Sequence, residues 1–124
     1  MQTPLTYRDV FHREIRAFMK ELMNVFPKER DIKMLSSSLT ISLMDDPEDK
    51  VVARFYKSFC TCEEYIETQD ERMFYDSVIQ SDLELLQKLS QYWKQLDEDN
   101  KQVVWNYLKV LYQLSKSILH VQNK

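Results

Sequence analysis

The absence of glycine is the feature of this sequence that most limits how the chain can fold. None of its 124 residues is glycine, whereas an average usage of about 7% would give roughly nine. Tight β-hairpins, phosphate-binding loops and the turns that present catalytic serines need glycine where the backbone takes a positive φ or closely approaches a ligand. Helices joined by Asp, Asn, Ser and Pro do not, so we expect an all-α protein.

Apolar residues recur at helical spacing along most of the chain. The spacing predicts five helices, over about residues 7–26, 30–44, 47–68, 81–96 and 98–119. Thr6 and Asp97 are the expected N-caps of the first and last helices, and Asp46 before Pro47 marks the start of the third. Residues 69–80 fit a loop, a short helical turn, or both.

The length and composition favour one domain. A chain of 124 residues with 44% hydrophobic residues can bury one core without stabilising disulfides or metals. Four or five helices with short connections favour a single-domain bundle over residues 1–124, mostly antiparallel. The second helix is the weakest of the five, because the serines at 36–38 compete for backbone hydrogen bonds.

The last predicted helix is apolar on two faces. One stripe contains Val104, Leu111 and Ile118, and a second face carries Trp105 and Tyr112. A helix that is apolar nearly all round is normally buried. If the bundle covers only one of these faces, a second chain must cover the other. We therefore count Trp105 and Tyr112 as candidate partner contacts.

Acidic residues are concentrated in the middle of the chain. The net charge is −3, and residues 45–82 hold eleven Asp and Glu against four Lys and Arg. Glu63 and Glu67 lie on one side of the third predicted helix, where a solvated acidic face could dock a basic partner. Carboxylate-bridged metal bundles need Glu-x-x-His pairs. The sequence has only an isolated Asp9-x-x-His12, so we expect no metal and no cofactor.

A basic strip runs along the first predicted helix. Arg13, Arg16 and Lys20 lie opposite its apolar face, Arg8 and His12 extend the strip, and two glutamates interrupt it. Such a strip could contact phosphates or an acidic protein. Because the chain as a whole is acidic, nucleic-acid binding is the less favoured of the two.

The cysteines and histidines do not suggest a catalytic site. Cys60 and Cys62 are two positions apart, which on a helix turns their side chains about 200° from each other. They can therefore share neither a disulfide nor a metal, and we expect Cys62 in the core and Cys60 near the surface. A catalytic serine would need a nearby base and an oxyanion hole, but His12 and His120 lie at opposite ends of the chain. We expect no enzyme and no small-molecule substrate.

Two further features bear on where the protein acts. The chain has only two cysteines and no recognisable signal peptide, which predicts an intracellular protein, cytoplasmic or nuclear. The longest uncharged stretch, residues 34–44, has 11 residues and includes four serines and a threonine. A bilayer needs about 20 mostly apolar residues, so we expect no membrane association.

Three segments carry a resemblance to a known group of proteins. These are Tyr92 to Lys101, Val104 to Tyr112, and the opening segment from Phe18 to Pro27. They resemble short helical proteins encoded by nucleocytoplasmic large DNA viruses of algae and protists. In that family a tryptophan-bearing helix, a cap of acids and asparagine, and a Trp-x-Tyr-Leu-x-x-Leu helix follow one another. This chain departs from the pattern because no Gly or Pro precedes the tryptophan helix, and residues 34–80 are unmatched.

The family has no assigned activity, so the resemblance implies a viral context and no catalytic residue. We therefore expect a non-enzymatic protein-interaction or structural module, and the resemblance implies a virion or virus-factory component. The expected partner is another protein or a second copy of the chain. The alternative is a small nucleic-acid-associated protein that uses the basic strip.

Overall fold

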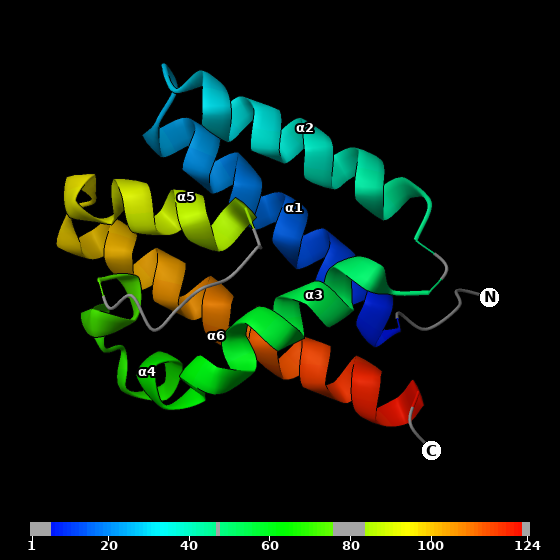
Figure 1. Ribbon diagram of the computed structural model, residues 1–124. Coiled ribbons are helices and arrows are strands. Elements are labelled where there is room, and N and C mark those ends of the chain that lie inside the picture. Colours follow the sequence, from blue (N-terminus) through cyan, green and yellow to red (C-terminus); the bar gives the residue numbers. More distant parts are fainter. Residues whose placement is uncertain (1–5, 47, 76–83, 123–124) are drawn as a thin grey trace.

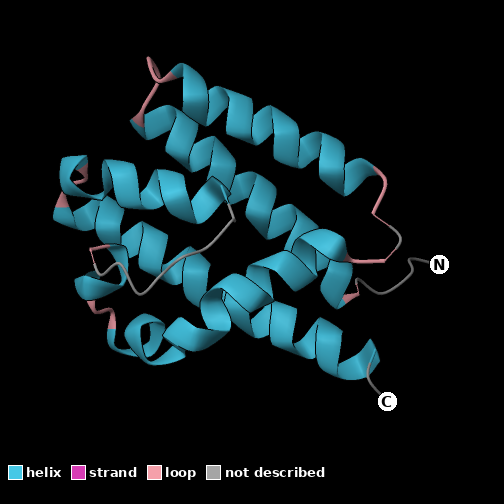
Figure 2. Ribbon diagram, in the orientation of Figure 1, coloured by secondary structure: helices cyan, strands magenta, loops and turns pink. Residues whose placement is uncertain are grey.

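A computed structural model describes residues 6–46, 48–75 and 84–122, which form helices joined by turns (Figure 2). The α-helices are α1 (Tyr7–Val25), α2 (Arg30–Met44), α3 (Lys50–Phe59), α4 (Glu63–Thr68), α5 (Glu84–Tyr92) and α6 (Glu98–Gln122). Three short 3₁₀ turns are η1 (Cys60–Cys62), η2 (Glu71–Phe74) and η3 (Trp93–Gln95). The prediction of an all-α bundle is confirmed.

The first helix begins where the sequence predicts. The Thr6 hydroxyl accepts a hydrogen bond from the Asp9 backbone N–H at 3.1 Å, and the Asp9 carboxylate accepts from the Thr6 N–H at 3.2 Å. This reciprocal capping box satisfies two of the N–H groups that a helix start leaves unpaired. The second helix also matches its predicted range despite its serines.

The predicted helix over 47–68 is not continuous. Its first part, α3, begins at Lys50. There the Asp46 carboxylate accepts hydrogen bonds from the backbone N–H groups of Lys50 and Val51. Pro47 lies outside the described residues. The turn η1 then interrupts the helix, so that α3 and α4 are separate elements. The change to 3₁₀ geometry reorients the chain, so α3 and α4 each pack against α6.

The later helices also differ from their predicted bounds. The fourth predicted helix ends in the tighter turn η3, and its proposed start at Ser81 lies outside the described residues. Asp97 caps α6 as predicted, because its carboxylate accepts from the Asn100 N–H at 2.8 Å. Helix α6 continues three residues beyond 119, to Gln122. For residues 69–80, the sequence fitted a loop, a short helical turn, or both. Residues 71–74 form the turn η2, and residues 76–80 lie outside the described residues.

Helix α6 is the main packing partner of three other helices. It lies against α1, α3 and α4, while α2 packs antiparallel to α1 on the far side from α6 and also touches α5 (Figure 1). The buried apolar side chains form one continuous cluster, in which Phe11, Phe18, Phe55, Phe59 and Trp93 are fully or almost fully buried. This arrangement leaves α2 at the edge of the bundle, where no helix of the described ranges covers its outer side (Figure 1).

Cys62 is buried and Cys60 is half-buried, as the sequence predicts, and both are free thiols. Within the described ranges, every helix is either too short or too polar to cross a lipid bilayer.

Candidate interaction surfaces

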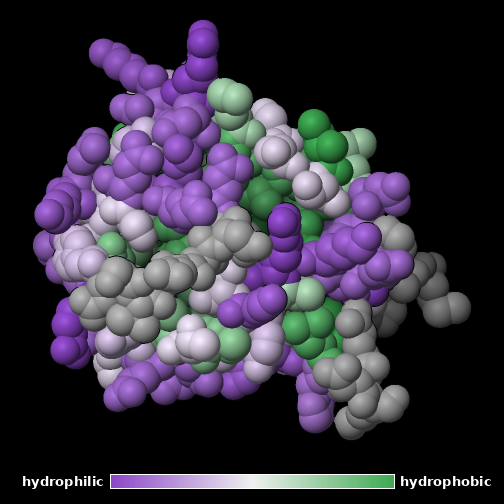
Figure 3. All heavy atoms as spheres, in the orientation of Figure 1, coloured by the Kyte–Doolittle hydropathy of each residue, from purple (hydrophilic) through white to green (hydrophobic). Residues whose placement is uncertain are grey.

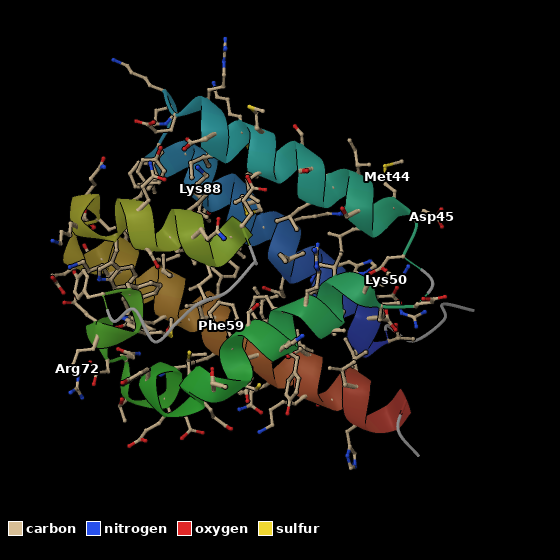
Figure 4. All side chains as sticks on the ribbon, in the orientation of Figure 1. Met44, Asp45, Lys50, Phe59, Arg72 and Lys88 are labelled. Carbon is tan, nitrogen blue, oxygen red and sulfur yellow. The ribbon has the colours of Figure 1, made fainter. Side chains whose placement is uncertain are left out.

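The outer face of α2 is the most apolar exposed helix face in the described residues. Met34, Ile41 and Met44 are 64%, 70% and 75% exposed. The opposite side of α2 is anchored in the core by Ile32, Leu35 and Leu43. Hydrophobic residues interrupt an otherwise largely hydrophilic surface over the C-terminal half of α2 (Figure 3), and Met44 points away from the rest of the bundle (Figure 4). Large apolar side chains gathered on one helix commonly mark a docking surface.

Polar contacts from α5 fix how α2 is rotated. The Tyr92 hydroxyl donates to the Asp31 carboxylate at 2.8 Å, and Lys88 donates to the same carboxylate at 3.0 Å. The hydrogen bond from Tyr92, and then that from Lys88, hold the pKa of Asp31 below its usual value. Because Asp31 is tied to α5, the face that carries Met34 and Ile41 is held toward solvent.

Small and charged residues complete this outer face. Ser37 and Ser38 are exposed between Met34 and Ile41, Arg30 is exposed at the first turn, and Asp45 is exposed at the C-cap. With 3.6 residues per turn, these positions fall within a sector of about 100° around the helix axis. We define the α2 outer face as the residues that share this sector together with the flanking Met44: Arg30, Met34, Ser37, Ser38, Ile41, Met44 and Asp45.

The two charges lie at the ends of α2 that the helix dipole disfavours. A positive charge at an N-terminus and a negative charge at a C-terminus each cost about 0.3–1 kcal/mol at exposed positions. Arg30 and Asp45 have this unfavourable placement. They therefore slightly destabilise α2 in the isolated chain, so their positions are not explained by the stability of the helix itself.

The basic strip predicted on α1 is exposed but reduced. Arg13, Arg16 and Lys20 all face solvent, and the Arg13 guanidinium lies 3.4 Å from the Glu14 carboxylate. Arg8, which was expected to extend the strip, instead pairs with Asp49. The strip therefore presents three basic side chains, one of them partly neutralised.

The predicted acidic face is mostly neutralised within the chain. Glu63 accepts from Lys116 at 3.0 Å and from the Tyr112 hydroxyl at 3.2 Å. Two further carboxylates of the segment, Asp70 and Glu71, pair with Arg72 and Lys101 at 2.6 and 2.9 Å. Glu67 is exposed. No three His, Cys, Asp or Glu side chains among the described residues lie close enough to hold a metal ion.

The structure brings two of the predicted residues together, Glu63 and Tyr112. Hydrogen bonding from Lys116 is the main reason why the pKa of Glu63 is lowered, and burial is the main reason why the pKa of Tyr112 is raised. The Tyr112 ring also stacks on Tyr56, with ring centres 5.9 Å apart. This cluster joins α3, α4 and α6 and is a packing contact.

The expectation that Trp105 and Tyr112 face a partner is wrong. They are 4% and 2% exposed, because other parts of this chain cover both apolar sides of α6. The Trp105 ring packs against Phe74 and Trp93 at centroid distances of 5.4 and 5.3 Å. Residues of the turns η2 and η3 thus supply the cover that was assigned to a second chain.

An open hollow of about 490 Å³ lies next to the Tyr112 cluster, along the last turns of α6. The hollow is lined by the titratable residues Tyr56, Lys116 and His120. The other lining residues are Gln113, Ser117 and Leu119. Because Lys116 is already paired with Glu63, the hollow offers little net charge to an anionic ligand. Ser117 and His120 lie three positions apart on α6 in this lining.

Sequence reasoning missed the α2 outer face. The signal was present, because Met34, Ile41 and Met44 fall outside the stripe of Ile32, Leu35, Leu39 and Leu43 that anchors α2 in the core. Apolar residues that do not fit the buried stripe of a helix are the sign that could have revealed this face.

Comparisons with family models, with curated proteins and with solved structures found no match to this chain. The resemblance to viral helical proteins stays a prediction.

Proposed function

We propose that this protein is a non-enzymatic protein-interaction module that binds its partner through the α2 outer face. The observation that carries the proposal is the exposure of Met34, Ile41 and Met44 on one helix whose rotation is fixed by core packing and by Asp31. Burying three such side chains contributes about 1.5–3 kcal/mol each, which gives a partner a substantial driving force.

The charge distribution supports a protein partner over a nucleic acid. The net charge is −3, and the basic strip on α1 is reduced because Arg8 pairs with Asp49 and the Arg13 guanidinium lies 3.4 Å from the Glu14 carboxylate. Nucleic-acid binding depends on many phosphate contacts and falls steeply with salt. The resemblance of the C-terminal helices to viral proteins agrees with a structural role in a virion or virus factory.

Site-specific photocrosslinking tests the proposal. A photoreactive amino acid is introduced at Ser38 on α2 or, as a control, at Lys57 on α3, both of which are exposed. Irradiation is carried out on the purified protein and in cells that produce it. We expect a discrete protein adduct from position 38 and none from position 57.

Two further variants show whether the apolar side chains drive the contact. Replacing Met34 and Ile41 by Ser removes apolar area from α2, whereas Val110→Ser changes an exposed apolar residue on α6 that is 45% accessible. We expect the adduct from position 38 to disappear in the first variant and to persist in the second. Equal adducts from both positions, or none from either, would refute the proposal.

A further inference from the structure

The exposed residues of α2 are arranged symmetrically about the middle of the helix. Ser37 and Ser38 lie at the centre, Met34 and Ile41 lie on either side of them, and Arg30 and Asp45 lie at the two ends. Position 30 is as far before the centre as position 45 is after it, and the same holds for 34 and 41. All six positions belong to the α2 outer face.

This symmetry makes the face complementary to itself in an antiparallel orientation. When two copies of α2 pair across a two-fold axis centred between Ser37 and Ser38, Arg30 of each copy lies opposite Asp45 of the other. Met34 then lies opposite Ile41, and the small serines face each other at the centre. A two-fold interface requires such a pattern, in which residue i contacts j and j contacts i.

We infer that the partner of the α2 outer face is a second copy of this chain, bound through antiparallel α2–α2 packing. This inference rests on the proposed function and names the occupant of the same surface. In this pair the exposed side chains of Met34 and Ile41, four in all, would be buried on either side of the serines at the centre.

The orientation follows from the charges. In a parallel pair, Arg30 would face Arg30 and Asp45 would face Asp45, which is repulsive at both ends. In the antiparallel pair, two Arg30–Asp45 contacts form. This explains why each residue lies at the end of α2 that the helix dipole disfavours: their favourable partners lie on the other chain. An unrelated partner would not require the positions to be balanced about the helix centre.

The size of the α2 outer face sets the expected affinity of the dimer. One face of a helix of 15 residues forms an interface at the small end of those between proteins, where total buried areas are below about 1,200 Å². We therefore expect a reversible dimer with a dissociation constant on the order of micromolar or weaker. The apparent mass should rise from 15.0 kDa toward twice that value as the concentration increases.

Charge-reversal variants test both the partner and the orientation. R30D places acidic side chains at both ends of α2, and D45R places basic side chains at both ends. Each variant alone should lose self-association by at least tenfold, as measured by sedimentation velocity across a dilution series. Mixed in equal amounts, the two variants should form a heterodimer, because every contact is then between opposite charges. The double variant R30D/D45R should dimerise like the wild type.

The matched control is Lys57→Asp, which reverses an exposed charge on α3 and should leave dimerisation unchanged. Circular dichroism of every variant shows whether it is folded, and formation of the heterodimer in the mixture itself shows that both single variants retain their α2 face. A wild-type chain that stays at 15.0 kDa up to about millimolar concentration would overturn the inference. So would single variants that dimerise as the wild type does, or a mixture that stays monomeric.

The crosslinking result separates this inference from the proposed function. A position-38 adduct of twice the chain mass supports both. If dilution shows only monomers and position 38 crosslinks to a different protein, the second copy is excluded as the partner while the interaction function stands. If position 38 gives no adduct and the chain is monomeric, both fail.

Discussion

Arg8 on α1 and Asp49 at the start of α3 form a bidentate ion pair. Nε and Nη2 of the arginine each donate a hydrogen bond to a different carboxylate oxygen at 2.6 Å. Asp49 is fully buried and has a left-handed φ of 55°, whereas the arginine side chain is 48% exposed. The pair connects positions 41 residues apart and fixes where α3 begins relative to α1.

Removing this arginine should destabilise the fold. In Arg8→Met the Asp49 carboxylate loses its bidentate partner but stays buried. Breaking a buried pair from one side typically costs about 3–5 kcal/mol, and we expect the lower end of that range because Arg8 is half exposed. Urea unfolding of the variant measures the loss. Arg13→Met, which removes an exposed arginine from the same helix, should change stability by less than about 0.5 kcal/mol; similar losses in both variants would contradict the role given to Asp49.

His12 should make the protein less stable in mild acid. Its Nε2 atom is buried and has no hydrogen-bond partner among the described residues. Burial, followed by the nearby charge of Arg16, lowers the pKa of His12 from its ordinary 6.5. The unfolded chain therefore binds a proton at a pH where the folded chain does not, and the free energy of unfolding should fall as pH drops below about 6.5. Urea unfolding between pH 7.5 and 5 measures this dependence.

The His12→Gln variant should lose most of that pH dependence. His120→Gln, which changes an exposed histidine at the end of α6, is the control and should keep it. A wild-type stability that is flat between pH 7.5 and 5 would show that His12 titrates alike in the folded and unfolded chains.

Glu63 should stabilise the contact of α4 with α6 at neutral pH. Hydrogen bonding from Lys116 lowers the pKa of Glu63 below its ordinary 4.5. The stabilisation is therefore present above pH 4.5 and is lost as pH falls through the lowered pKa of the folded state. We expect Glu63→Gln to lower the thermal midpoint at pH 7, and the difference from wild type to shrink below pH 4.5. Glu67→Gln, on the same helix but exposed, should behave like wild type at both pH values.

The interior faces of α6 should be intolerant of truncation. Leu111 is fully buried, so Leu111→Ala should cost about 2–5 kcal/mol, and Trp105→Ala about 3–5 kcal/mol. Val110→Ala, at a neighbouring position that is 45% exposed, should cost less than about 0.5 kcal/mol. Urea unfolding of the three variants provides the comparison. If Trp105→Ala left the free energy of unfolding nearly unchanged, Phe74 and Trp93 would not enclose the indole.

Much of the secondary structure could be predicted because it depends on local pattern. The apolar spacing and the Thr6 and Asp97 caps act within a few residues, so α1 and the start of α6 were predicted correctly. The break at Cys60–Cys62 could not be predicted in this way. The apolar spacing continues through it, and the need to turn the chain so that both α3 and α4 reach α6 is a property of the packed bundle.

The candidate surfaces were harder to predict because exposure depends on every neighbour of a residue. Trp105 and Tyr112 looked like surplus apolar surface along one helix, yet residues from η2, η3 and α3 cover them. Glu63 looked like part of a docking face, but Lys116, more than fifty residues later in the sequence, neutralises it. Neither partner can be identified from the spacing of residues within one helix.

The sequence by itself determined that the chain is helical, since its apolar residues recur at helical spacing and it has no glycine for the tight turns that connect β-strands. Only the tertiary structure decided which apolar residues remain at the surface. Both sides of α6 are covered, whereas α2, at the edge of the bundle, keeps Met34, Ile41 and Met44 in solvent. The physical reason is that a helix at the edge of a bundle has neighbours on one side, while a helix at its centre has neighbours nearly all round.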